Sequence, residues 1–145
     1  PATLVARDTA NDLALLQVTG VSDLTPATLG DSDATIVGDD VVAVGNALAL
    51  EGGMSVTRGI VSALHRSIEA GSESGSEALS GRIQTAAAIS SGNSGGPLVN
   101  SKGEVIGINT AVAGSSNGTT ASNIGFAIPI DTAKTIVERL RTSGG

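Results

Sequence analysis

Residues 92–97, with the sequence Gly-Asn-Ser-Gly-Gly-Pro, constrain this chain more than any other stretch. Three glycines within five positions allow the main chain to adopt positive φ angles and to approach neighbouring groups closely. A serine in such a turn can hold its hydroxyl outward while nearby N–H groups converge on one point, which is the arrangement of a nucleophile beside an oxyanion hole. The alternative is a glycine-rich turn that contains Ser94 without using it. The flanking sequence has to distinguish the two interpretations.

The composition favours a single all-β domain with an aliphatic core. The chain has 145 residues, of which 40% are hydrophobic, but Phe126 is its only aromatic residue, so Val, Ile, Leu and Ala have to fill the core. β-Branched residues that alternate with glycine are typical of strands. The chain has no cysteine, which excludes a disulfide framework, a thiol nucleophile and a thiolate metal site.

Charge and hydropathy exclude further classes of protein. The net charge is −6 and the basic residues are few and scattered, which argues against a nucleic-acid partner. No apolar run approaches the roughly 20 residues of a membrane span, and no motif points to a metal ion or another cofactor. The chain opens within a strand-like run, so we expect a fragment of a longer protein.

Short strand-like runs separated by turns predict a small barrel. Residues 3–6 and 13–18 form a hairpin-like pair, and a polar connector follows at residues 19–40. Leu24 and Leu29 of this connector are expected to contact the body of the domain. Six further runs follow, with a hairpin turn at residues 100–103: residues 41–45, 55–64, 82–86, 97–99, 105–112 and 124–128. Six short strands suit a closed barrel, because closure removes exposed edges.

The remaining sequence predicts two loops and one helix. Residues 69–80 are acidic and rich in Gly and Ser, so we expect a mobile loop there, and residues 114–122 are similar but uncharged. Asp131 is a suitable N-cap, and Gly144 is placed to end the helix. The apolar residues between them have helical spacing: Ala133, Ile136, Val137 and Leu140.

Six segments occur together in one order along the chain: residues 12–16 (Asp-Leu-Ala-Leu-Leu), 56–64, 83–85, 92–100, 103–110 and 124–129. Through them the chain resembles the HtrA family of trypsin-like serine proteases, whose fold has two six-stranded β-barrels with the active site between them. The resemblance implies that residues 1–40 are the end of the first barrel and the inter-barrel connector, residues 41–130 the second barrel, and residues 131–145 a C-terminal helix. The expected fold is all-β: a six-stranded antiparallel Greek-key barrel, a C-terminal helix and a residual hairpin of the first barrel.

The resemblance also assigns catalytic roles. Ser94 is the expected nucleophile, and Asp12 matches the aspartate that orients the catalytic histidine. Asp8 is the rival acid, but it lacks the Leu-Ala-Leu-Leu continuation, so we interpret it as a turn residue. The oxyanion hole is expected from the N–H groups of Gly92 and Ser94, with Asn93 between them.

The histidine of the expected triad has no counterpart here. The only histidine, His65, follows Asp12 in the sequence, whereas the family's histidine precedes the aspartate. We therefore interpret His65 as a surface or loop-packing residue. Because a serine hydroxyl without a base is a poor nucleophile near neutral pH, the isolated chain is expected to be inactive.

The specificity pocket is expected to be small and apolar. Ala88 falls near its base, where no acid is available to bind Lys or Arg. Together with Ile124 and Phe126, it suggests a preference for aliphatic side chains before the cut. The strand edge at Asn123, Ile124 and Gly125 could hold the substrate backbone by strand addition. The alternative for Ile124 and Phe126 is plain barrel core.

The predicted function is that of part of an HtrA-like serine endopeptidase, which acts on misfolded or exported proteins outside the cytoplasm. Polypeptides are the expected substrates and the missing first barrel the expected partner, and the resemblance leaves a homotrimeric or membrane-anchored parent open. The alternative is a non-catalytic homologue that binds peptides or serves as a scaffold. The intact Asp12 and Ser94 motifs favour the enzyme, whereas the absent catalytic histidine favours the homologue.

Overall fold

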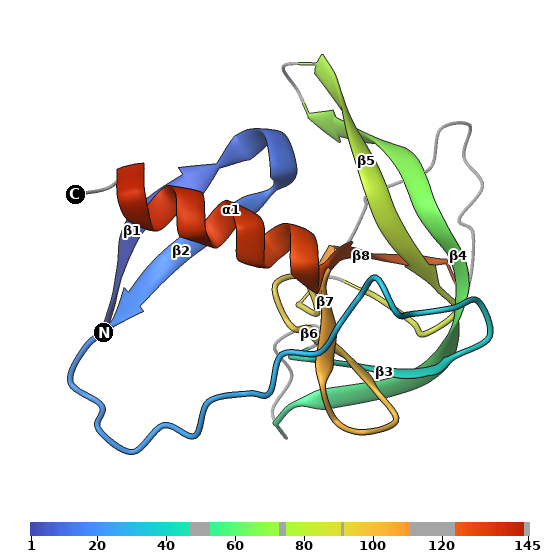
Figure 1. Cartoon of the computed structure of the whole chain (residues 1–145), viewed down its shortest axis with the longest axis horizontal. Helices are drawn as coiled ribbons and strands as arrows, with labels where there is room; N and C mark the ends of the chain where they lie inside the picture. Colours follow the sequence, from blue (N-terminus) through green and yellow to red (C-terminus); the bar gives the residue numbers. More distant parts are fainter. Residues whose placement is uncertain (47–52, 73–74, 91, 111–123, 144–145) are drawn as a thin grey trace.

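The computed structural model describes residues 1–46, 53–72, 75–90, 92–110 and 124–143. It contains a closed β-barrel, a separate two-stranded sheet, and one helix that lies between them (Figure 1). In chain order the elements are β1 (Ala2–Asp8), a 3-10 helix (Thr9–Asn11), β2 (Leu13–Val18), β3 (Asp40–Gly45), β4 (Ser55–Ser72), β5 (Gly75–Thr85), β6 (Pro97–Asn100), β7 (Val105–Thr110), β8 (Gly125–Pro129) and α1 (Ile130–Ser143). The expected all-β fold with a six-stranded antiparallel barrel, a helix and a hairpin is confirmed.

The barrel closes because β6 pairs with β3, which gives the order β3-β4-β5-β8-β7-β6. All six ladders are antiparallel. Along β3, alternate residues are buried, as the two-residue period of a strand requires. The resulting core is aliphatic throughout and consists of Val41, Ala43, Val61, Ile83, Ala87, Leu98, Ile106 and Ala127.

The prediction of a mobile loop at residues 69–80 is wrong, because β4 and β5 continue through most of that segment. Glu69 lies opposite Ala78, and Ser72 lies opposite Gly75. The two strands project beyond the barrel as a long hairpin (Figure 1). Backbone hydrogen bonds hold a ladder of this kind whatever the polarity of its side chains, and this is why composition misled the prediction. The predicted loop at residues 114–122 lies outside the described residues.

Helix α1 joins the two-stranded sheet to the barrel. Its buried residues occur at the predicted helical spacing and pack against Leu13 of β2, Val105 of β7 and Ile128 of β8. The shared cluster contains Leu13, Val105, Ile128, Ile130, Ala133, Ile136 and Leu140. Arg139 of α1 also forms an ion pair with Asp8 at the end of β1. The sheet is therefore held to the barrel through the helix.

The connector docks through its backbone, not through leucine side chains. Leu29 contacts the body of the domain as expected, through a backbone bridge to Val105, but its side chain is 51% exposed and that of Leu24 is 64% exposed. Instead, the N–H of Gly30 donates to the carbonyl of Val105 (2.8 Å), and the N–H of Val105 donates to the carbonyl of Thr28 (2.8 Å). These bonds form a parallel bridge at the start of β7.

Asp131 is not the N-cap that the sequence predicted, because α1 begins one residue earlier, at Ile130. Asp131 lies in the first turn, and its side chain links the helix to the connector. Its Oδ2 accepts hydrogen bonds from the N–H and the hydroxyl of Ser32 (2.6 and 2.8 Å), and its Oδ1 accepts one from Lys134 Nζ (2.9 Å). The Ser32 hydroxyl in turn accepts from the N–H of Asp131 (3.1 Å). The Lys134 hydrogen bond is the largest influence that lowers the pKa of Asp131 to about 2, and the bonds from Ser32 act in the same direction against desolvation.

This lowered pKa predicts an acid-sensitive contribution to stability. A carboxyl group with a lower pKa in the folded state stabilises the protein above its unfolded-state pKa, and the stabilisation is lost as the pH falls from about 4 to about 2. We expect Asp131→Asn to lower the free energy of unfolding at pH 7 by about 1–2 kcal/mol, a value reduced for partial exposure, and to flatten the loss between pH 4 and 2. Urea unfolding at several pH values measures both effects. The exposed Asp23→Asn is the control, and equal stability of Asp131→Asn and wild type at pH 7 would contradict this account.

Candidate active site

The turn that carries Ser94 is set by glycine geometry. Gly92 and Gly95 have φ angles of +97° and +83°, a region that disfavours other residues. The N–H of Gly96 donates to the carbonyl of Asn93 (3.0 Å), and a Cβ at Gly96 would collide with the carbonyl oxygen of Val44 in β3. Ser94 itself is exposed at the tip of this turn. A serine here is accessible, while the backbone around it is tightly fixed.

Asn93 anchors the turn from below. It is 1% exposed, and its Nδ2 donates to the carbonyl of Ala88 (3.4 Å). Its N–H donates to the carbonyl of Ser90 (3.0 Å), so this N–H is turned into the protein. Any side chain at Gly45 would collide with Asn93. The inward orientation of Asn93 is compatible with its predicted place between the two oxyanion donors. That the N–H groups of Gly92 and Ser94 are these donors remains a prediction.

The end of β7 connects this turn to Asp12. The N–H of Gly95 donates to the carbonyl of Asn109, and the N–H of Asn109 donates to the carbonyl of Gly96 (2.8 Å each). The next residue, Thr110, donates its hydroxyl to Asp12 Oδ2 (3.0 Å). Two consecutive residues of one strand therefore hold the serine turn and the aspartate. Sequence reasoning gave neither a role, although two polar residues that end an apolar strand were a visible signal.

Asp12 and its rival Asp8 occupy different environments. Asp12 has a left-handed backbone (φ 59°, ψ 43°), ends the 3-10 helix and leaves its side chain exposed except for the bond to Thr110. Asp8 is the N-cap of that helix, and its carboxylate accepts from the N–H and from Nδ2 of Asn11 (3.0 Å each). The interpretation of Asp8 as a turn residue is thus confirmed.

His65 lies at an irregular point of β4, with a φ angle of +55°, and is exposed. It borders a cavity of about 70 Å³ that is also lined by Ser32, Asp33, Thr35, Leu64, Gly81, Ile83 and Pro129. Neither Asp12 nor any residue of the Ser94 turn lines this cavity. Its position agrees with the interpretation of His65 as a surface residue.

Of the predicted specificity residues, Phe126 and Gly125 belong to β8, and Ile124 directly precedes it. Phe126 of β8 lies opposite Thr110 on one side and Gln84 on the other, and it is half-buried. Ile124 is 45% exposed, so it does not belong to the barrel core. Gly125 is buried where a Cβ would collide with Ile89. Ala88 is exposed and its carbonyl accepts from the Thr57 hydroxyl (2.9 Å), whereas Asn123 lies outside the described residues.

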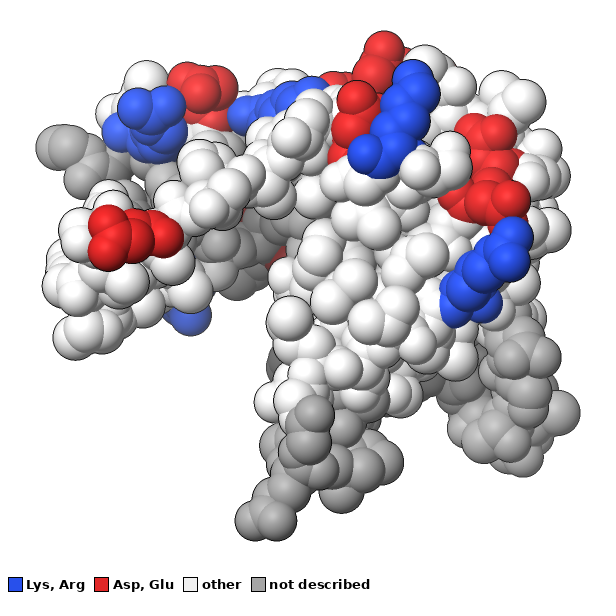
Figure 2. Space-filling view, turned by 90° about the horizontal axis from the view of Figure 1, so that it is seen from below, with Lys and Arg blue, Asp and Glu red and all other residues white. Residues whose placement is uncertain are grey.

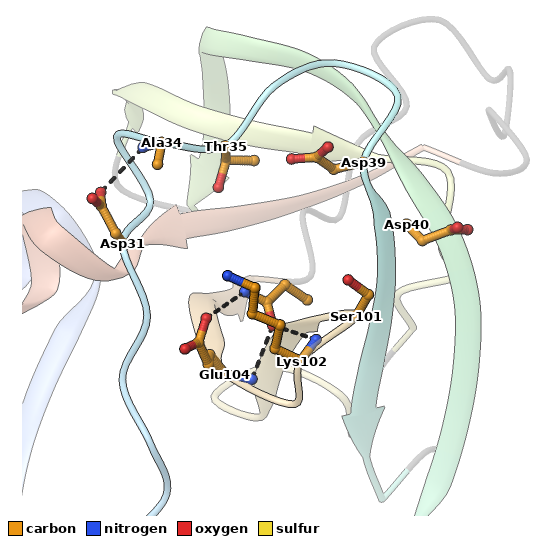
Figure 3. A pocket seen from close by; sticks show the side chains of 9 residues that line it. Asp31, Ala34, Thr35, Asp39, Asp40, Ser101, Lys102 and Glu104 are labelled. Atoms are coloured by element: carbon orange, nitrogen blue, oxygen red, sulfur yellow. Dashed lines mark hydrogen bonds between the residues drawn. The ribbon is translucent and has the colours of Figure 1, made fainter.

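A larger cavity, of about 290 Å³, lies away from these residues, between the connector and the β6–β7 turn (Figure 3). Four of its nine lining residues are acidic, but the Asp31 carboxylate already accepts from the N–H groups of Asp33 and Ala34 (2.9 and 3.1 Å). Among the described residues, no group of His, Cys, Asp and Glu is arranged to hold a metal ion. On the face shown in Figure 2, basic side chains are dispersed among acidic ones. No helix of the described part is long and apolar enough to cross a membrane.

A closed barrel that holds an exposed serine turn and an aspartate at one strand end is the arrangement of a trypsin-like peptidase. Residues 1–108 match the family described as the trypsin-like peptidase domain, and the chain belongs to this family. It is 45% identical over 150 residues to the serine protease PepD of Mycobacterium tuberculosis, with 99% of this chain and 32% of PepD covered. It is 47% identical over 139 residues to the periplasmic pH-dependent serine endoprotease DegQ of Escherichia coli, with 96% of this chain and 29% of DegQ covered.

A solved structure supports the same relationship. The HtrA-type protease AlgW, determined with a decapeptide, superposes with a TM-score of 0.81 at 40% identity, with 99% of this chain and 41% of that chain covered. The resemblance to the HtrA family is therefore confirmed. The chain spans about a third of the length of the curated relatives it matches.

The tight contact at Gly96 predicts a specific loss of stability. A side chain at this position would push against the backbone of β3, so we expect Gly96→Ala to lower the free energy of unfolding by about 2–3 kcal/mol. Gly103→Ala is the matched control, because Gly103 has a φ angle of +76° but open space around it, and about 1 kcal/mol is expected there. Urea unfolding of both variants checks this. Equal losses would show that the packing beneath the serine turn is loose.

Proposed function

We propose that this chain supplies the nucleophile Ser94 and the triad acid Asp12 of a serine endopeptidase. The observation that carries the proposal is the pair of adjacent residues at the end of β7, since Asn109 bonds the serine turn and Thr110 bonds the Asp12 carboxylate. If the glycine turn had no catalytic role, nothing would require the strand that bonds to it to bond also to an exposed aspartate. Membership of the trypsin-like peptidase family supports these roles.

In the proposed reaction, Ser94 Oγ attacks the carbonyl carbon of the scissile peptide bond. A histidine from outside these 145 residues accepts the serine proton and then donates it to the leaving amine, and water hydrolyses the acyl-enzyme. Asp12 holds the imidazole in the required tautomer and stabilises its charged form. The N–H groups of Gly92 and Ser94 donate hydrogen bonds to the oxyanion.

Residues 1–40 belong to the end of the first barrel and the connector in this proposal. Leu4 and Leu16 form an exposed cross-strand pair on the small sheet, and the rest of the first barrel would cover them.

The proposed roles are tested in the full-length protein. We expect Asp12→Asn to lower kcat by about 10⁴-fold and Ser94→Ala by about 10⁶-fold, because each removes one member of the triad, while Ser90→Ala keeps activity. Hydrolysis of an unfolded protein such as casein, followed by peptide release, measures this. Full activity of Ser94→Ala would overturn the proposal.

The 145-residue polypeptide alone is expected to give no Ser94-dependent hydrolysis in the same assay. Its one histidine, His65, borders a cavity that contains neither Asp12 nor the serine turn. If the full-length protein also fails to hydrolyse the substrate but binds peptides, the protein is a non-catalytic homologue that binds peptides.

Polypeptides are the proposed substrates, and the names of relatives favour a site outside the cytoplasm. AlgW was determined with a decapeptide, and DegQ and DegP of Escherichia coli are named as periplasmic. We propose that misfolded or exported proteins are cleaved there. The substrate backbone would add to the strand edge at Ile124 and Gly125, next to the β8 residue that lies opposite Thr110.

The apolar surroundings of the site predict a preference for small aliphatic residues before the cut. Ala88 offers no charge, and Ile124 and Phe126 offer apolar surface. We expect the full-length protein to cleave after Val, Ala or Ile at least about tenfold faster than after Lys or Arg. Mass spectrometry of the products from a peptide library measures this ratio. A preference for Lys or Arg would contradict the pocket assignment.

A further inference from the structure

Arg82 of β5 is a buried cation that the proposed chemistry does not use. It is 1% exposed and is among the largest fully buried side chains of the described residues. Burying an arginine is costly unless its charge and its donors are satisfied. Nη1 donates to the carbonyl of Ser80 (3.2 Å) and Nη2 to the carbonyl of Asn11 (3.1 Å), but Nε has no hydrogen-bond partner in the described part of the chain. The residue therefore keeps a cation in the interior at a cost.

The acceptor of Nη2 lies directly before the proposed triad acid. Asn11 ends the 3-10 helix, and Asp12 follows with its left-handed backbone. Asp8 of β1 holds the N–H and the side chain of Asn11, and Arg82 holds its carbonyl. The segment that presents Asp12 is thus fixed from the small sheet on one side and from the barrel on the other.

The charge of Arg82 acts on the same residue. Burial lowers the pKa of Arg82, and the nearby Asp12 carboxylate raises it in return. The guanidinium remains charged at neutral pH, as arginine does in proteins. Opposite Arg82 in the β4–β5 ladder lies Arg66, but Arg66 is exposed. A neutral donor would suffice for two carbonyl acceptors, so the positive charge needs another reason, and Asp12 provides one.

We infer that Arg82 is a positioning residue for Asp12: it fixes the carbonyl of Asn11, the residue before Asp12, and adds a buried positive charge to the part of the barrel on which this segment rests. The inference rests on the proposed role of Asp12 in the catalytic triad. β5 ends at Thr85 and precedes the serine turn in the chain, so the strand that supports the Asn11–Asp12 segment is also the last barrel strand before Ser94. The bonds from Arg82 and Thr110 reach the Asn11–Asp12 pair from two different barrel strands.

Removing this charge should change the pH dependence of the reaction in a known direction. A cation near Asp12 opposes protonation of the catalytic histidine, so its loss raises the pKa of that histidine. The acidic limb of the kcat/KM profile then moves to higher pH, by roughly half a unit. A residue that merely supports the fold would leave the limb in place.

The experiment compares three variants of the full-length protein. We expect Arg82→Gln to lower kcat about 10–100-fold with KM within about twofold, because a misplaced triad acid weakens the transition state, and to shift the acidic limb upward. Arg82→Lys keeps the positive charge but loses the planar guanidinium group. The acidic limb of the kcat/KM profile should therefore stay in place, while kcat recovers in part relative to Arg82→Gln. Arg66→Gln removes an exposed charge from the opposite strand and should match wild type.

A double-mutant cycle separates this inference from the proposed function. If Arg82 acts through Asp12, Arg82→Gln has less than about a twofold effect in the Asp12→Asn background. Circular dichroism and urea unfolding report the fraction of folded enzyme in each variant. The inference is overturned if Arg82→Gln only reduces that fraction, or if its effect persists unchanged without Asp12. If Asp12→Asn and Ser94→Ala keep full activity, it is instead the proposed function that fails.

Discussion

The apolar cluster around α1 is the interaction on which the proposed site depends. Leu13, the residue after Asp12, is buried in this cluster together with Ile136 and Leu140 of the helix. Burial of one such side chain contributes about 1.5–3 kcal/mol, so the cluster supplies most of the free energy that holds the small sheet against the barrel. Without it, only polar contacts would place Asp12, chiefly the hydrogen bonds from Thr110 to Asp12 and from Arg82 to Asn11, and each bond of this kind contributes only about 1–3 kcal/mol.

Polar contacts fix the orientation of the turn that carries Asp12 once the small sheet is packed against the barrel. The Arg139–Asp8 ion pair fixes the turn at its outer side, and Thr110 and Arg82 approach it from the barrel. The serine turn is fixed separately, by its glycines and by the buried Asn93. The serine turn and the Asp12 turn both bond to the end of β7, through Asn109 and Thr110 respectively. Catalytic groups held in this way lose little orientation when a substrate binds, which favours reaction.

The sequence alone allowed the fold class and the two proposed catalytic residues to be predicted, because both depend on local pattern. Strand periodicity, the helical spacing of Ala133, Ile136 and Leu140, and the glycine turn are read from neighbouring residues. Thr110 and Arg82 were missed, because their contacts join residues 98 and 71 positions apart and no local pattern records such pairs. The long β4–β5 hairpin was missed for another reason: its backbone pairs through a stretch whose composition is typical of loops.

Ser94 is proposed as a nucleophile whose reactivity depends on Asp12. The most direct measurement is covalent labelling of the full-length protein with a fluorophosphonate, followed by mass spectrometry of the peptide adducts. We expect one adduct, on Ser94, and a labelling rate that falls at least about 100-fold in Asp12→Asn. An adduct on a different serine, or a labelling rate that does not change in Asp12→Asn, would contradict it.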